Sequence, residues 1–358
     1  MASNLTWHED PTAPVAIADA LRRLLRRCHA ESLECVPARA LNLVCVVPAE
    51  QAAAAAQRLR AAGRHHASRT IVCAVHPGRT ALGATAAIDS GTDPRPGTFA
   101  ALLETVALDI GERHIPYLDT IVDPLVVSDL PTVAWVPDRD DAVVPLLAIA
   151  QALLVDSVEE ADLDRALRRA EELGRHAHVV DLAWLRSTPW RERVAAAFDP
   201  PDLRAELEAI TALTVRHEPS SRASAVLLAG WLASRLDWRA SPLSACGDDL
   251  AGTAGDISIV LSPVPGQRVR GLGGLTLRTA SGRMLSLDRG PGGLAARSRD
   301  PDGSERAWTV LGASRGEPGI FGEGVRHALL RDPAYPPALV AARGLLREPG
   351  RKEGPWTR

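Results

Sequence analysis

The sequence predicts an α/β fold: an N-terminal, mostly parallel sheet with flanking helices, followed by an α+β domain with an antiparallel β meander. Two patterns carry this prediction. LNLVCVV at 41–47 and TIVCAV at 70–75 are apolar runs separated by an alanine-rich helical stretch, which is the spacing of a βαβ unit. Residues 257–311 alternate apolar and polar positions in short runs, and the intervening SG, RGPGG and DPDG favour hairpin turns.

The length of the chain indicates two domains. With 358 residues, of which 46% are hydrophobic, the chain is long enough for two interiors. We therefore expect an N-terminal α/β domain over 1–155 and a C-terminal α+β domain over 156–347. Residues 348–358 read as a polar, disordered tail.

Periodicity and turn chemistry predict the other N-terminal elements. Residues 14–28 form an amphipathic helix whose polar face carries Arg22, Arg23, Arg26 and Arg27. After a strand that ends at Asp156, Ser157 and Glu160 have the spacing of a capping box and predict that a helix begins there. The remaining expectations are strands at 104–110 and 132–136 and a covering helix over 115–127.

The C-terminal half is less regular. VVDLAWL is apolar enough for a strand, and Thr188 as N-cap with Pro189 at the first helical position predicts that a helix follows it. The remaining expectations are a strand at 210–217, a helix over 221–236, and short helices around 325–332 and 338–346.

Composition excludes several classes of protein. A net charge of −3 argues against general nucleic-acid binding. No apolar run approaches the ~18 residues of a membrane span, and the N-terminus lacks the pattern of a signal peptide, so a cytoplasmic location is expected. Five scattered cysteines fit neither a disulfide framework nor a C-x-x-C motif. Cys45 and Cys73 lie in predicted buried strands, whereas Cys28 and Cys35 are expected to be exposed.

No sequence motif for catalysis, a cofactor or a metal is present. The chain has no GxxxxGK[ST], GxSxG or HExxH, and its GLGG lies within the predicted meander. The most site-like residues are His65, Ser68 and Arg69 in GRHHASRT. They would suit an anion such as a sugar phosphate, because arginine matches phosphate geometry, or they belong to a loop at the sheet edge in which Ser68 and Arg69 bond to the backbone.

The stretch DLAWLRSTPWRERV at 181–194 is rich in tryptophan and arginine. These two residue types are over-represented at interface hot spots, although a tryptophan taken alone is more often core. The residue types in this stretch are therefore compatible both with a protein interface and with a buried core segment.

Several segments of this chain resemble one known family. DLAWLRSTPWRE looks like the signature of the glucose-6-phosphate dehydrogenase assembly protein (OpcA) family, and ALNLVCVV, GRHHASRTIV, SDLPTVAWVP and LLVDS match it in the same order. The similarity covers about residues 40–240. The chain departs from the family pattern at Ala67, where the family tends to have proline, and around DLP, where only Trp135 remains of a tryptophan-richer stretch.

The resemblance implies a protein without catalysis or cofactor. Family members bind glucose-6-phosphate dehydrogenase and promote its assembly or activity in the oxidative pentose phosphate pathway, so an assembly factor or allosteric activator is expected. By the same resemblance, Trp184, Arg186, Trp190 and Arg191 are candidate partner-binding residues. The alternative is a sugar-phosphate-binding protein or enzyme with a site around His65, Ser68 and Arg69.

Overall fold

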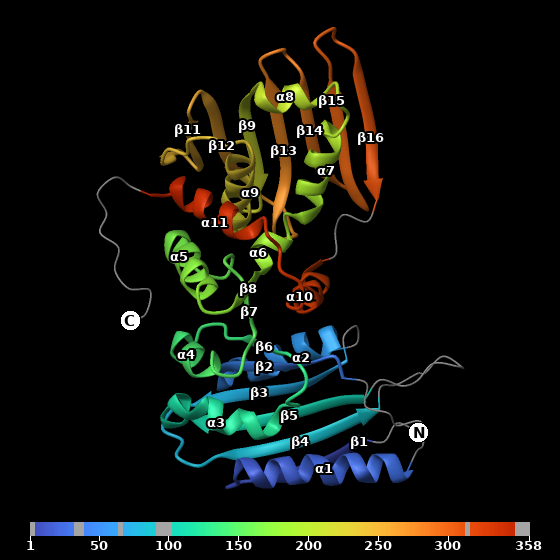
Figure 1. Cartoon of the computed structure of the whole chain (residues 1–358), viewed down its shortest axis with the longest axis vertical. Helices are drawn as coiled ribbons and strands as arrows, with labels where there is room; N and C mark the ends of the chain where they lie inside the picture. The colour runs from blue at the N-terminus through green and yellow to red at the C-terminus, as the bar shows by residue number, and fades with distance from the viewer. Residues whose placement is uncertain (1–3, 32–38, 64–66, 91–101, 312–315, 348–358) are drawn as a thin grey trace.

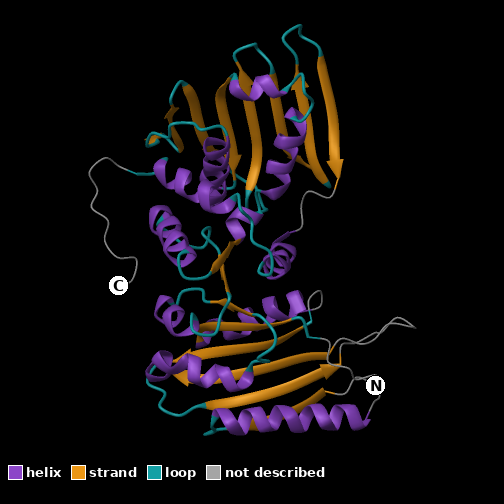
Figure 2. Cartoon of the chain, in the orientation of Figure 1, coloured by secondary structure: helices purple, strands orange, loops and turns teal. Residues whose placement is uncertain are grey.

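Two eight-stranded sheets lie at opposite ends of the molecule, with a layer of helices between them (Figure 1, Figure 2). The computed structural model describes residues 4–31, 39–63, 67–90, 102–311 and 316–347. The predicted fold class, an α/β protein with a mostly parallel N-terminal sheet and a second sheet rich in antiparallel strands, is confirmed.

Sheet A, the N-terminal sheet, is parallel except at one side. Its strands in spatial order are β1 (Asn4–Glu9), β4 (Gly83–Ser90), β5 (Leu102–Gly111), β3 (Ser68–His76), β2 (Leu41–Pro48), β6 (Thr132–Trp135), β7 (Ala152–Val155) and β8 (His178–Asp181). The first seven residues of β2 and the first eight of β3 are all buried, because central parallel strands are covered on both faces. The sheet extends beyond residue 155, since β8 pairs in parallel with β7. Strand β1, which no pattern predicted, pairs antiparallel with β4.

The strand order of sheet A reverses direction beside β2. From β2 the chain passes to β3, then to β4 and back to β5 on one side, and it returns to place β6, β7 and β8 on the other side. Strands β2 and β6 are parallel neighbours, so their carboxyl ends open at the same edge of the sheet. In open α/β sheets such a switch point leaves a crevice between loops that diverge.

The helices of the N-terminal half agree with prediction except at two places. They are α1 (Pro14–Glu31), α2 (Ala52–Gly63), α3 (Leu118–Val122), α4 (Val143–Leu146) and α5 (Leu163–Gly174), with single turns η1 (Ala49–Gln51), η2 (Glu112–Tyr117), η3 (Asp123–Leu125) and η4 (Asp140–Ala142). The helix expected over 115–127 is broken into short turns, since Pro116 and Pro124 lie within it. The prediction that a helix begins at Ser157 with a capping box is wrong. Helix α5 begins at Leu163, and Asp162 caps it by accepting from the backbone N–H of Arg165.

Sheet B, the C-terminal sheet, contains a more complex pairing than a meander. Its strands in spatial order are β10 (Ser244–Cys246), β11 (Asp249–Ala254), β12 (Ile257–Pro263), β9 (Ile210–His217), β13 (Leu272–Thr279), β14 (Met284–Gly290), β15 (Gly293–Arg299) and β16 (Glu305–Leu311). Strand β9 inserts between β12 and β13, parallel to the first and antiparallel to the second. The true meander therefore runs from β13 to β16.

The C-terminal helices connect the two sheets. They are α6 (Leu182–Leu185), α7 (Thr188–Phe198), α8 (Arg204–Glu208), the turn η5 (Pro219–Ser221), α9 (Arg222–Arg235), α10 (Gly316–His327) and α11 (Tyr335–Gly344). Helix α9 packs against β9 and β12 on one side and against α11 on the other. Gly230 permits this close crossing, because a Cβ there would lie 2.4 Å from the carbonyl oxygen of Ala338. None of the helices in the described part of the chain has the length and apolarity to span a bilayer.

The cysteines follow the prediction only in part. Cys45 and Cys73 are free and buried, and burial raises the pKa of both thiols, that of Cys73 to about 12. Cys28 was expected to be exposed and outside any disulfide; instead it is 1% exposed on α1 and disulfide-bonded. Cys246 is free and exposed, and Cys35 lies outside the described residues.

Candidate functional site

The tryptophan- and arginine-rich stretch lies at the junction between the two sheets. It begins at the last residue of β8, the edge strand of sheet A, and continues through α6 into α7 (Figure 1). The strand ends earlier than expected because the Asp181 side chain accepts from the backbone N–H of Ala183 and caps α6. Helix α7 begins at Thr188 with Ser187 as its N-cap, one residue before the predicted cap.

Arg186 forms the most deeply buried ion pair of this junction. Its Nη1 and Nη2 atoms donate to the two carboxylate oxygens of Asp156 at 2.7 and 2.8 Å, and the side chains are 2% and 1% exposed. The pair joins the residue after β7 to the end of α6. Gly271, with φ of +100°, brings the loop before β13 against the Arg186 stem, since a Cβ there would lie 3.3 Å from Cβ of Arg186. One arginine therefore holds three separate segments together.

Asp181 is a second buried carboxylate at the junction. Its Oδ1 atom accepts from the backbone N–H groups of Ser157 and Ala183, and its Oδ2 atom accepts from the hydroxyls of Ser157, at 2.6 Å, and Tyr335, at 3.1 Å. Burial raises the pKa of Asp181 to about 6, although these hydrogen bonds favour the charged form. Burial and the nearby Asp181 carboxylate also raise the pKa of Tyr335.

Trp184 and Arg191 share a third carboxylate, that of Asp332. The Nε1 atom of Trp184 donates to Oδ2 of Asp332 at 2.8 Å, and the Arg191 guanidinium lies 3.4 Å from the Trp184 ring centroid and 3.6 Å from the same oxygen. Burial lowers the pKa of Arg191 to about 10, and the charge of Asp332 opposes that shift. Trp190 is 1% exposed and belongs to the core.

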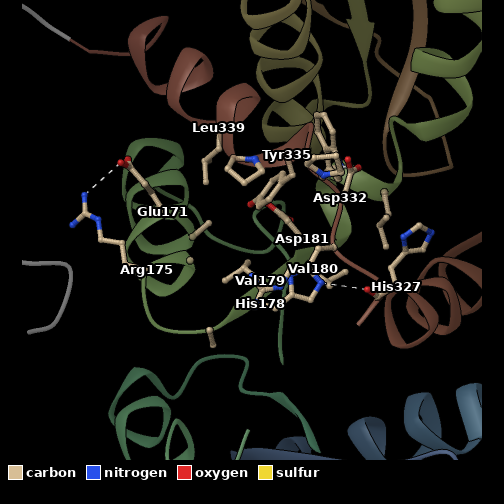
Figure 3. Close-up of a pocket in the computed structure, with 18 of the residues that line it drawn as sticks. Glu171, Arg175, His178, Val179, Val180, Asp181, His327, Asp332, Tyr335 and Leu339 are labelled. Carbon is tan, nitrogen blue, oxygen red and sulfur yellow. Dashed lines mark hydrogen bonds and ion pairs between the residues drawn. The ribbon is translucent and has the colours of Figure 1, made fainter. Parts of the chain in front are cut away.

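Four residues of these contacts, Asp181, Trp184, Asp332 and Tyr335, line a cavity of about 590 Å³, here called the junction groove. Figure 3 shows Tyr335 and Asp181 meeting between α5 and the segment that joins α10 to α11. His178 of β8 closes one end, because its Nε2 atom lies 3.0 Å from the carbonyl oxygen of Leu330. The lining is mainly apolar, and at its rim Leu330 and Val340 are 54% and 58% exposed. A mainly apolar groove with a few fixed polar groups suits a ligand or a partner side chain.

The residues predicted for partner contact are all in the interior. Trp184, Arg186, Trp190 and Arg191 are between 1% and 9% exposed, and of the four only Trp184 lines the junction groove. The other three pack in the interior beneath the residues that line the groove. Asp156, Asp332 and Tyr335, which complete these contacts, were missed because they come from distant segments that carry no local motif.

Two of the three alternative residues, Ser68 and Arg69, are buried. Ser68 and Arg69 lie on β3, in the centre of sheet A, instead of in a loop. Arg69 pairs with Glu104 at 2.8 Å and donates to the carbonyl oxygen of Leu125, so its guanidinium is already engaged. His65 lies outside the described residues.

Two family models match this chain on either side of the loop between α5 and β8. The model described as the glucose-6-phosphate dehydrogenase subunit N-terminal domain, of OpcA, matches residues 59–172, and the C-terminal domain model of the same subunit matches residues 177–339. The chain belongs to the OpcA family. Its two matched regions meet at the junction that carries the DLAWLR stretch.

Three curated relatives carry the name OpcA, for an OxPP cycle protein. The chain is 30% identical to that of Synechococcus elongatus over 141 residues, which is 38% of this chain. It is 36% identical to that of Nostoc punctiforme over 124 residues and 32% identical to that of Synechocystis sp. over 126 residues, in each case 33% of this chain. The aligned stretches span 32%, 27% and 26% of these relatives' own lengths.

Proposed function

We propose that this OpcA-family protein is a non-catalytic assembly factor and allosteric activator of glucose-6-phosphate dehydrogenase, acting in the oxidative pentose phosphate pathway of the cytoplasm. The observation that carries the proposal is the match of both domains of the OpcA subunit family, over residues 59–172 and 177–339. The protein would promote oligomerisation or activity of the enzyme only by binding one of its states more tightly than another.

The rim of the junction groove is the proposed contact with the dehydrogenase. Leu329, Leu330 and Val340 are three of the large apolar side chains that are most exposed in the described residues, and two of them line the groove. Grouped exposed apolar side chains are typical of protein interfaces. The buried motif residues Trp184, Arg186, Trp190 and Arg191 would then support binding indirectly, by fixing the shape of the groove.

The test combines the purified protein with the dehydrogenase of the same organism. We expect co-elution in size-exclusion chromatography and a lowered KM or raised kcat of the enzyme. Absence of both effects across the full range of substrate concentrations would refute the assignment. A change in kinetics without a larger complex would exclude assembly but retain activation.

Variants at the groove test the proposed contact separately. L330R and V340R place a charge at the rim, and each should weaken the complex at least about tenfold, since burying an unpaired charge costs more than 1.4 kcal/mol. V144R is the matched control, because Val144 is 62% exposed but lies on α4, beside sheet A. Equal loss in all three variants, or none in L330R and V340R, would place the interface elsewhere.

A further inference from the structure

The crevice at the switch point of sheet A contains a set of charged side chains that the proposed function does not use. Its lining residues come from the ends of β2 and β6, from α2 and from the loop before β13. Figure 1 shows α2 on the side of sheet A that faces sheet B. Ligands of open α/β sheets bind at this place, because the loops that follow the two strands turn in opposite directions. We call it the switch-point crevice; the residues that matter in it are Gln51, Arg58, Trp135, Asp138, Glu159 and Arg270.

Two arginines from the two halves of the chain converge in this crevice. Nη1 of Arg58, on α2, lies 3.1 Å from Oε1 of Glu159, and Nη1 of Arg270, in the loop before β13, lies 3.4 Å from the same oxygen. The two side chains are 34% and 42% exposed. A guanidinium has five N–H donors, and one carboxylate oxygen occupies only a small part of this capacity.

The Arg58 guanidinium is held in position by two aromatic rings. It lies 4.9 Å from the ring centroid of Trp135, at the end of β6, and 5.4 Å from that of Phe321, on α10. The centroids of these two rings are 4.7 Å apart, and the rings meet edge to face. An arginine stacked in this way loses little entropy when it binds an anion, because its orientation is already fixed.

The rest of the crevice combines apolar side chains with the polar side chains of Gln51, Asp138 and Ser220. The part beside the arginines has a volume of about 360 Å³, and it adjoins a polar part of about 600 Å³ that shares Trp135, Asp138 and Glu159 with it. Asp138 has a φ of +59°, in the left-handed region, and accepts from Nε2 of Gln51 at 3.0 Å.

The nearby acids do not all repel an anion. Asp140 faces Arg165 and Arg169 at 2.9 and 2.6 Å, and Asp141 is paired with Arg139 at 2.6 Å. Glu159 itself occupies the place between Arg58 and Arg270 that an anionic group would take. It therefore acts as an internal competitor for the two guanidinium groups.

We propose that the switch-point crevice binds a small phosphate ester of a polyhydroxyl compound, that is, a sugar phosphate. Arg58 and Arg270 bind the phosphate, since their planar forks match its oxygens, and the ester displaces Glu159 from them. The Asp138 carboxylate, which lines the crevice, accepts hydrogen bonds from the hydroxyl groups. The ligand thereby bridges the two halves of the chain.

Calorimetric titration of the full-length protein tests this proposal, with ribose 5-phosphate, inorganic phosphate and ribose as probes. We expect binding of ribose 5-phosphate with a Kd no weaker than about 1 mM, weaker binding of inorganic phosphate, and no heat from ribose. R270Q should weaken binding of the ester about tenfold or more. R268Q is the matched control, because Arg268 is an exposed arginine of the same loop and does not line the crevice.

The most discriminating variant is E159Q. It removes the competing carboxylate charge but keeps the size of the side chain, so it should tighten binding of the ester several-fold. Failure of both phosphate compounds to bind, or an equal Kd in wild type, R270Q and R268Q, overturns the site. Unchanged or weaker binding in E159Q overturns the displacement step, and phosphate binding as tight as that of the ester overturns the role of the hydroxyl groups. The dehydrogenase is absent from these titrations, so they are independent of the proposed function.

Discussion

The buried pair of Arg186 and Asp156 makes a quantitative prediction about stability. In R186M the aliphatic stem that packs under Gly271 is retained, but the Asp156 carboxylate, 1% exposed, loses its partner. Removal of one member of a buried pair costs about 3–5 kcal/mol, which is at least about a fifth of the ~5–15 kcal/mol that stabilises a typical domain. R186M should therefore shift the midpoint of urea unfolding strongly while leaving the m-value unchanged.

A double variant distinguishes the loss of the ion pair from a general disruption of packing at the junction. R186M/D156L removes both charges, and it should recover most of the loss, to within about 2 kcal/mol of wild type, because no buried charge is left unpaired. R299M is the matched control at an exposed pair, that of Arg299 and Glu305, where less than about 1 kcal/mol should be lost. If R186M lost as little unfolding free energy as R299M, the Arg186 pair would contribute little to stability, and the prediction would be refuted.

Three further predictions concern other buried contacts. G230A should destabilise the protein by about 2 kcal/mol or more, measured by thermal unfolding, because the new Cβ would meet the α11 backbone at 2.4 Å; G174A, with open space around it, should not. R69M should cost less than R186M in urea unfolding, about 1–3 kcal/mol, because Glu104 retains its contact with Arg39. Burial raises the pKa of Asp181 in the folded protein from its ordinary value of 3.8 to about 6. Its contribution to stability is therefore full below pH 3.8 and is lost as the pH rises to about 6. That loss is on the order of 3 kcal/mol. D181N should lack it in unfolding measured between pH 4 and 7, because its amide oxygen can still accept from the two backbone N–H groups and its amide nitrogen can donate to the hydroxyl oxygens of Ser157 and Tyr335. A pH profile identical to that of wild type would contradict this.

The sequence predicts those parts of the fold that depend on local pattern. The apolar runs of β2 and β3, the amphipathic α1 and the turns of β13 to β16 all follow from periodicity and turn residues, which act over a few positions. Strand β1 was missed because its partner β4 lies about eighty residues away, and only that pairing gives NLTWHE an extended structure. The insertion of β9 between β12 and β13 also depends on pairing between distant segments, which local sequence patterns do not predict.

The candidate site also depends on contacts between distant segments, which the local sequence does not reveal. Residue type predicts partner contact for Trp184, Arg186, Trp190 and Arg191, and the structure buries all four. Burial decides whether such residues face a partner or the core, and it depends on segments far away in the chain. Ser157 was assigned to a helix cap, since its spacing to Glu160 fits one. Its hydroxyl instead donates to Asp181, a stronger acceptor that comes near only in the folded chain.

The short turn after β7 places three of these interactions on consecutive or nearly consecutive residues. Asp156 binds Arg186, Ser157 binds Asp181, and Glu159 faces Arg58 and Arg270. Displacement of Glu159 by a ligand would thus pull on the same turn whose Asp156 and Ser157 bind Arg186 and Asp181 at the junction. Thermodynamic linkage makes such coupling mutual, so a partner bound at the groove would change the affinity of the crevice by the same factor that the ligand changes the affinity of the partner. A four-residue turn could in this way report the level of a metabolite to a protein assembly.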